Sequence, residues 1–161
     1  MACRQYGPGT GPPYRFVATA GAGQRTPSGL SGTAKRGQVP YAAVVELHGC
    51  NGSGASGVAR ADVLKSFGNV ALALGSLGDF QHLHRGYISD GGLAEHFDAC
   101  AVLDWLAKQS CVDADQVALL GFSMGAQATL DAVKPGFIEN KKQRHFRAAI
   151  AYYPWCRDCE V

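Results

Sequence analysis

Four short apolar runs without strict alternation of apolar and polar positions stand out along the chain. They cover residues 41–47, 70–74, 117–121 and 148–153, and each ends at or just before a glycine or proline. Such a run is typical of a strand buried on both faces of a sheet. Between the runs, apolar residues at three- and four-residue spacing predict helices over residues 58–67 and 93–109, and a third helix ends near residue 133. Strands that alternate with helices indicate crossover connections, so we predict a three-layer α/β fold with a mostly parallel sheet.

The first forty residues follow a different pattern. Residues 1–40 are rich in Gly, Pro, Ser and Thr and have little periodicity, which predicts a loop-rich N-terminal segment. Residues 14–19 and 30–34 are candidates for short edge strands within it. A length of 161 residues favours a single domain, so the apolar core is expected to occupy residues 41–161.

Composition removes several classes of function. Hydrophobic residues make up 47% of the chain, enough for a packed core, and the net charge is only +2 without a basic stripe. Nucleic-acid binding is therefore not expected. No apolar run approaches the length of a membrane span, and the first residues lack the apolar core of a signal peptide, so we expect no membrane association and a cytoplasmic location.

The six cysteines are widely spaced, and in a cytosolic protein they favour reduced thiols over disulfides. Cys156 and Cys159 have the spacing of a redox or metal pair, but they lie at the end of the chain without further ligands nearby. We interpret them as structural or incidental. The sequence has no metal-ligand cluster and no glycine-rich phosphate loop, so neither a metal nor a cofactor is expected.

The segment Gly121-Phe-Ser-Met-Gly125 matches the G-x-S-x-G pattern and lies between a predicted strand and a predicted helix. This context indicates a nucleophile elbow, in which Ser123 occupies a strained turn and is presented at the carboxyl end of the sheet. Side chains at the two flanking positions would collide with their surroundings, which explains the glycines. The pattern predicts that Ser123 is a catalytic nucleophile.

A second glycine-rich turn, His48-Gly-Cys-Asn-Gly52, follows the first buried strand. A loop at this position can supply one donor of an oxyanion hole. We expect the backbone N–H of Cys50 to act with the N–H of Met124 on the substrate oxygen. Glu46, just before this turn, is a carboxylate inside an apolar strand and would need a buried partner.

These features together resemble the dienelactone hydrolase family of the α/β-hydrolases, in the branch that has a serine nucleophile. The resemblance extends from about Ala42 to Cys156, and the segments that carry it are Val44–Gly52, Val70–Leu74, Ala101–Ala107, Val112–Gly125 and Ala148–Pro154. It implies an α/β-hydrolase core and hydrolysis of small carboxylic esters or lactones through a Ser-His-acid triad and an acyl-enzyme. One departure is Gly75, where relatives tend to have an acidic residue.

The family places its acid and histidine after two further strands, which this sequence does not contain. The core over residues 41–161 is therefore expected to be incomplete at its carboxyl end. His82 and His84 follow the second buried strand and are candidates for a surrogate base, while Asp158 is a candidate acid; all three could equally be solvated loop residues. His48 is interpreted as a support for its own loop. His145 precedes the last strand and should lie at the opposite edge of the sheet.

Two functions remain open from the sequence. The first is a serine hydrolase of small esters or lactones. The alternative is a catalytically impaired relative that acts as a binding or assembly module, or is a gene fragment. In either case the strand at residues 148–153 would form an uncovered edge, which invites a homodimer.

Overall fold

The computed structural model describes residues 15–20, 40–52, 54–75, 91–134 and 144–154, which form eight helices and strands. In chain order these are β1 (Arg15–Ala20), β2 (Tyr41–Leu47), α1 (Gly54–Ser66), β3 (Val70–Gly75), α2 (Gly91–Leu106), β4 (Val112–Phe122), α3 (Met124–Ala132) and β5 (Ala148–Tyr152). The four apolar runs are confirmed as strands, and the three predicted helices are present. The candidate strand at residues 14–19 is β1, whereas the candidate at residues 30–34 lies outside the described residues.

The strands form one sheet in the order β1-β3-β2-β4-β5. Strands β3, β2, β4 and β5 are parallel, and β1 pairs with β3 in the antiparallel sense. Central strand β2 places Val45 between Leu72 of β3 and Leu119 of β4. The parallel order brings the carboxyl ends of β2 and β4 together, which is where ligand sites form in open α/β sheets.

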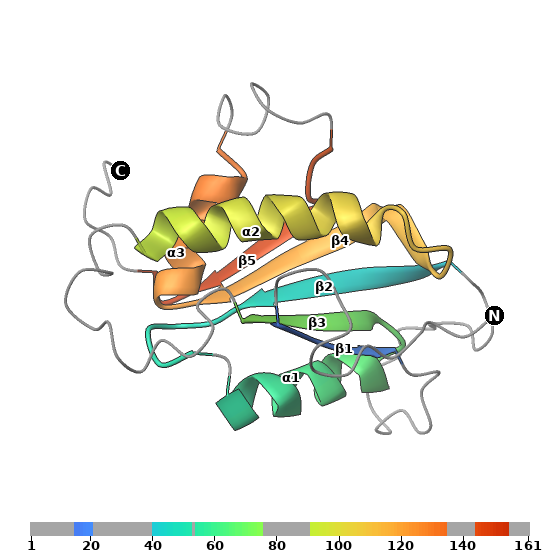
Figure 1. The fold of residues 1–161 in the computed structure, drawn as a ribbon, viewed down its shortest axis with the longest axis horizontal. Coiled ribbons are helices and arrows are strands. Elements are labelled where there is room, and N and C mark those ends of the chain that lie inside the picture. Colours follow the sequence, from blue (N-terminus) through green and yellow to red (C-terminus); the bar gives the residue numbers. More distant parts are fainter. Residues whose placement is uncertain (1–14, 21–39, 53, 76–90, 135–143, 155–161) are drawn as a thin grey trace.

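Helices cover the two faces of the sheet and confirm the three-layer α/β fold (Figure 1). Consecutive β4 residues point to opposite faces. Gly121 faces α3, since an added Cβ would lie 2.3 Å from Thr129 Oγ1, whereas the Phe122 ring lies under Arg60 of α1. The main core lies between the sheet and the layer of α2 and α3. Its largest fully buried apolar side chains are Val45, Leu47, Leu72, Leu74, Val102, Leu103, Leu106 and Leu119.

Helix α1 and strand β4 differ from the prediction in detail. The spacing predicted an apolar helix face from Val58 to Phe67, but both of these side chains are exposed, because α1 packs mainly on β3 at one side of the sheet. Strand β4 begins at Val112 and includes the predicted turn at Asp113–Asp115. The chain makes an irregular excursion there, since Tyr41 pairs with Val112 but Ala43 pairs with Val117.

The last strand is not buried as its apolar run predicted. β5 is an outer strand of the sheet, and Ile150 and Tyr152 are each 51% exposed. These two side chains share the face opposite α3, and α1 lies at the far side of that face over β3 and β1. An apolar run cannot distinguish a central strand from an outer one.

The described cysteines correct the expectation that the thiols are all reduced. Cys50 and Cys100 form no disulfide bond, as predicted, but Cys111 takes part in one. Among the described helices, none has the length and apolar character needed to cross a lipid bilayer.

Candidate active site

Ser123 occupies the sharp turn between β4 and α3 in a backbone conformation that serine rarely adopts. Its φ of 54° and ψ of −114° lie outside the regions favoured by L residues. The turn is held by a hydrogen bond from the Ser123 N–H to the carbonyl of Tyr152 at 3.0 Å. Stored strain of this kind concentrates at functional sites and is typical of a nucleophile elbow.

The two glycines of the elbow are required by sterics. A Cβ added to Gly121 would lie 2.1 Å from the Gly125 carbonyl oxygen, and a Cβ added to Gly125 would lie 2.6 Å from the His48 carbonyl oxygen. Real Cβ atoms do not approach other atoms so closely, so any other residue would push the backbone segments apart. The collision predicted from the G-x-S-x-G pattern is confirmed.

The turn formed by residues 48–52 packs directly against the elbow. The Gly125 N–H donates to the His48 carbonyl at 3.0 Å, and the Gly52 N–H donates back to the Gly49 carbonyl at 3.0 Å. Gly52 has a φ of 80°, which favours glycine. A Cβ added to Gly49 would lie 3.3 Å from the Ser123 Cβ and 3.9 Å from its Oγ, so the Gly49 backbone lies beside the predicted nucleophile.

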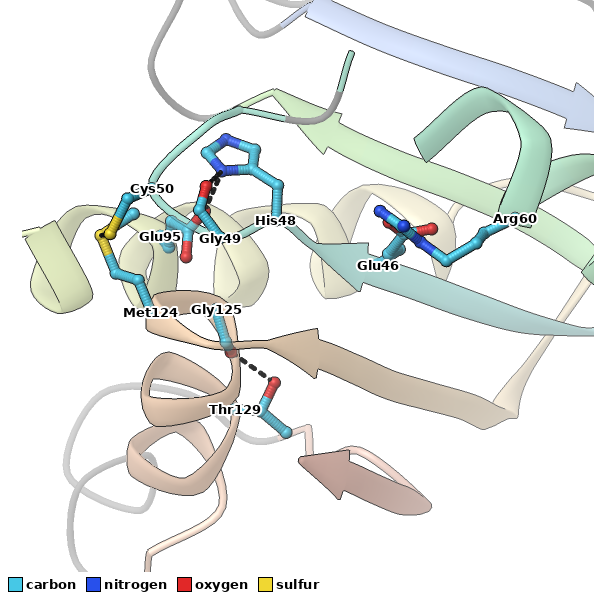
Figure 2. A network of polar contacts seen from close by, with 9 residues as sticks. All are labelled: Glu46, His48, Gly49, Cys50, Arg60, Glu95, Met124, Gly125 and Thr129. Carbon is cyan, nitrogen blue, oxygen red and sulfur yellow. Dashed lines mark hydrogen bonds and ion pairs between the residues drawn. The ribbon is translucent and has the colours of Figure 1, made fainter. Parts of the chain in front are cut away.

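Cys50 and Met124, the two residues expected to form the oxyanion hole, are brought together. Figure 2 shows their side chains meeting, with the Cys50 thiol 4.0 Å from the Met124 sulfur. Within the described residues, neither backbone N–H donates to a carbonyl. Met124 is also the first residue of α3, where the helix dipole concentrates partial positive charge. Two unused donors beside a serine at a helix N-terminus suit the stabilisation of an oxyanion.

His48 supports the turn from behind, through its imidazole. Nδ1 lies 2.7 Å from the Gly49 carbonyl oxygen and 3.0 Å from Oε1 of Glu95, which belongs to α2. Both neighbours are acceptors, so the hydrogen must be on Nδ1. Burial alone would lower the pKa of His48, but the hydrogen bond and charge of Glu95 outweigh burial and raise this pKa. Burial raises the pKa of Glu95 as well, against the opposing effect of His48.

Glu46, the carboxylate inside apolar strand β2, forms an ion pair with Arg60. Arg60 of α1 donates from Nε to Glu46 Oε1 at 2.7 Å, and its second nitrogen bonds the same oxygen (Figure 2). The guanidinium also lies 4.5 Å from the centroid of Phe122, which stacks on Tyr152 at 5.2 Å. Burial raises the pKa of Glu46, although Arg60 counteracts it. Arg60 and Tyr152 therefore both contact the ring of Phe122, the residue that precedes Ser123, and hold it in place.

The structure brings together three of the predicted site residues, Ser123, Cys50 and Met124. The candidate bases His82 and His84 and the candidate acid Asp158 lie outside the described residues. His145 is exposed just before β5, as expected. Among the residues that the structure describes, none makes a hydrogen bond to Ser123 Oγ.

Two site residues have roles that the sequence did not predict. Glu95 pairs with His48, and Arg60 pairs with Glu46. The sequence offered no signal for Glu95, because the same helical segment also contains His96, Asp98 and Asp104. The described contacts place Ser123 at a strained turn beside the backbone of Gly49, Cys50 and Met124.

No curated protein sequence matches this chain significantly. Among solved structures, a dienelactone hydrolase-like promiscuous phosphotriesterase from metagenomic libraries is 30% identical over 60% of this chain and 43% of its own, with a TM-score of 0.51. An acetyl xylan esterase from a Paenibacillus species is 25% identical over 73% of this chain and 40% of its own, with a TM-score of 0.54.

A third structure, a Klebsiella pneumoniae protein assigned to the dienelactone hydrolases, covers 88% of this chain and 60% of its own. Its TM-score is 0.55 at 17% identity, which shows the shared fold. The chain thus spans roughly half the length of the structures that it matches, and these matches confirm the resemblance to dienelactone hydrolases. The family model of the prolyl oligopeptidases matches residues 74–157, slightly more than half of the sequence, so the chain belongs to the prolyl oligopeptidase family.

Proposed function

We propose that this chain carries the nucleophile and oxyanion hole of a serine hydrolase that acts on small carboxylic esters or lactones. The observation that carries the proposal is Ser123, held at a strained elbow beside a glycine-lined turn. Among the described residues, the backbone N–H groups of Cys50 and Met124 beside it donate to no carbonyl. The similar structures include an esterase and a dienelactone hydrolase-like enzyme, and their activities support the same class.

The proposed reaction has two stages. Ser123 Oγ attacks the ester carbonyl carbon, and the carbonyl electron pair moves to oxygen to give an oxyanion held by the N–H groups of Cys50 and Met124. Collapse of this intermediate breaks the bond to the alcohol and leaves an acyl-serine. Water then attacks the acyl-serine by the same path and releases the acid. A general base accepts the serine proton and returns it to the departing alcohol.

The base is the part of the proposal that depends on residues outside the described ranges. We propose His82 or His84 as the base and Asp158 as the acid that orients it. His48 is a poor candidate because, among the contacts of the described residues, its imidazole is bonded to Gly49 and Glu95 through Nδ1, and neither ring nitrogen makes a hydrogen bond to Ser123 Oγ. Separate substitutions His82→Ala and His84→Ala are expected to identify the base, because only one of them should abolish activation of Ser123.

Labelling with a fluorophosphonate tests the nucleophile directly. The reagent forms a bond from Ser123 Oγ to phosphorus and releases fluoride, and intact mass measures the adduct. We expect stoichiometric labelling of the unaltered chain and none of Ser123→Ala. A folded chain that gains no mass would contradict the proposal.

One observation favours the alternative of a catalytically impaired binding module. Within the described residues, Ser123 Oγ has no hydrogen-bonded base, and oxyanion stabilisation alone leaves only about 10³–10⁴-fold rate enhancement. Weak hydrolysis of activated esters is thus expected of both candidates. The two candidates differ in how much the rate of ester hydrolysis falls when His82 or His84 is replaced. The fall should be large for a hydrolase with a surrogate base and negligible for the impaired relative.

A further inference from the structure

The carbonyl of Gly49 and the N–H of Cys50 belong to the same peptide unit. A trans peptide is planar, so these two groups point in opposite directions. The carbonyl is held by two donors, His48 Nδ1–H at 2.7 Å and the Gly52 N–H at 3.0 Å. The direction of the Cys50 N–H is therefore fixed from the far end of its own peptide unit.

Glu95 is the second component of this arrangement. Its side chain is 0% exposed, and among the described residues neither carboxylate oxygen has a hydrogen-bond partner, although Oε1 forms an ion pair with His48. Burying a carboxylate without full hydrogen bonding is costly, and buried polar groups without partners call for an explanation. Oε1 of Glu95 lies 3.0 Å from His48 Nδ1, where its negative charge favours the tautomer with the hydrogen on that nitrogen (Figure 2). This is the hydrogen that the Gly49 carbonyl accepts at 2.7 Å.

We propose that Glu95 and His48 are positioning residues for the oxyanion hole, and that they orient and polarise the Gly49–Cys50 peptide for substrates that develop negative charge on a carbonyl oxygen. The inference rests on the proposed function. The carboxylate polarises the imidazole, the imidazole N–H pulls electron density from the Gly49 carbonyl, and the Cys50 N–H becomes a stronger donor. Hydrogen bonds arranged in series strengthen one another in this way inside a protein.

Three variants separate this role from simple packing. His48→Leu removes the donor to Gly49, whereas His48→Asn retains an amide N–H near the position of Nδ1. Glu95→Gln keeps the shape of the side chain and removes its charge. Asp62→Asn is the matched control, because Asp62 is an exposed carboxylate that pairs with Lys65 on α1, away from the site.

The measurement is kcat and KM for p-nitrophenyl acetate and for its thionoester, whose sulfur is a poor hydrogen-bond acceptor. We expect His48→Leu to lower kcat for the oxygen ester by about 10²-fold, the usual effect of losing one oxyanion donor, with little change in KM. The thionoester rate should change much less. His48→Asn should recover most of the loss, and Glu95→Gln should lie between His48→Leu and the unaltered chain. Equal losses on both substrates, or a kcat that does not change, would overturn the proposal.

The amide proton of Cys50, followed by NMR in the free protein, gives a readout that does not depend on catalysis or on His48→Leu folding. Glu95→Gln and His48→Asn should shift it upfield, and Asp62→Asn should not. An unmoved Cys50 amide would refute the inference even if Ser123 were inactive. Conversely, a chain that is not labelled by fluorophosphonate but shows the expected shifts would refute only the proposed function.

Discussion

The Gly125 N–H donates to the His48 carbonyl at 3.0 Å, and this hydrogen bond joins the turn at Ser123 to the turn formed by residues 48–52. Gly125→Ala places a Cβ 2.6 Å from that carbonyl oxygen and must break or displace the bond. We expect a loss of about 1–3 kcal/mol of unfolding free energy, as for other overpacked sites, and loss of labelling at Ser123. Urea denaturation and intact mass measure the two effects.

Gly52→Asn is the control for this substitution. Gly52 has a positive φ, which asparagine tolerates, and open space where a Cβ would lie. It should be the milder change in both measurements, and equal damage from the two variants would contradict the steric account.

The strained backbone at Ser123 predicts a gain in stability from a residue that relieves it. Ser123→Gly should raise the unfolding free energy above that of Ser123→Ala by about 1 kcal/mol or more, because alanine retains the unfavourable φ of 54°. Both variants lack the hydroxyl and should fail to label. Thermal melts of the two provide the comparison, and an alanine variant as stable as the glycine variant would show that the elbow stores no strain.

Removing Arg60 should leave a buried negative charge without a partner. Arg60→Leu is expected to cost about 2 kcal/mol at neutral pH, less than for a fully buried pair, because the arginine side chain is 35% exposed. The double variant Glu46→Leu with Arg60→Leu should recover most of this loss, since apolar replacements of similar volume are well tolerated. Denaturation of Arg60→Leu, Glu46→Leu, the double variant and the unaltered chain completes a double-mutant cycle. A double variant less stable than Arg60→Leu would argue against the pair.

The buried acid–base groups predict a direction for stability against pH. The pKa values of Glu46 and Glu95 are raised by burial, and that of His48 is raised by Glu95. A group with a raised pKa binds more protons when folded, so its contribution is lost as the pH rises above the ordinary values of 4.5 for the carboxyls and 6.5 for the imidazole. The stability difference between the unaltered chain and Glu95→Gln should therefore fall between about pH 5 and about pH 8. A stability difference that grows with pH would show that the pKa values are lowered on folding and not raised.

The outer strand β5 predicts a second copy of the chain as its partner. We propose antiparallel pairing of the two β5 strands, since this strand is at the edge of the sheet and Ile150 is half exposed. Sedimentation at high concentration should show a dimer that Ile150→Lys dissociates. Val63→Lys, at an exposed position on α1, should leave it intact. A clean monomer of the unaltered chain at high concentration would end this proposal.

Local pattern was sufficient for most of the fold. Each apolar run is a strand in the structure. A strand of a parallel sheet has a continuous apolar run in its own sequence, so it can be predicted without knowing which strands it pairs with. The elbow could also be predicted, since the G-x-S-x-G pattern lies within five consecutive residues and Gly121 is required by its close approach to Gly125. The contact of Gly125 with the His48 carbonyl depends on the fold. The exposure of Ile150 could not, because an apolar run does not specify which strand lies outermost.

Contacts between distant segments were the part that the sequence could not provide. Glu46 required a partner, but nothing in the sequence identified Arg60, and nothing linked Glu95 to His48. Such pairs depend on helix placement over the sheet rather than on spacing along the chain. His82, His84 and Asp158 stay predictions.

Cys50 and Met124 meet across 74 positions of sequence, and this separation determines when the site can exist during folding. Contacts between distant segments require closure of a long loop, and they form after local turns and helices. The strand–turn–helix around Ser123 can form early, but the two proposed oxyanion donors, Cys50 and Met124, come together only when β2 and β4 have paired in register. A partly folded chain would thus carry an exposed serine without assistance, and reactivity at Ser123 would appear only with the complete sheet.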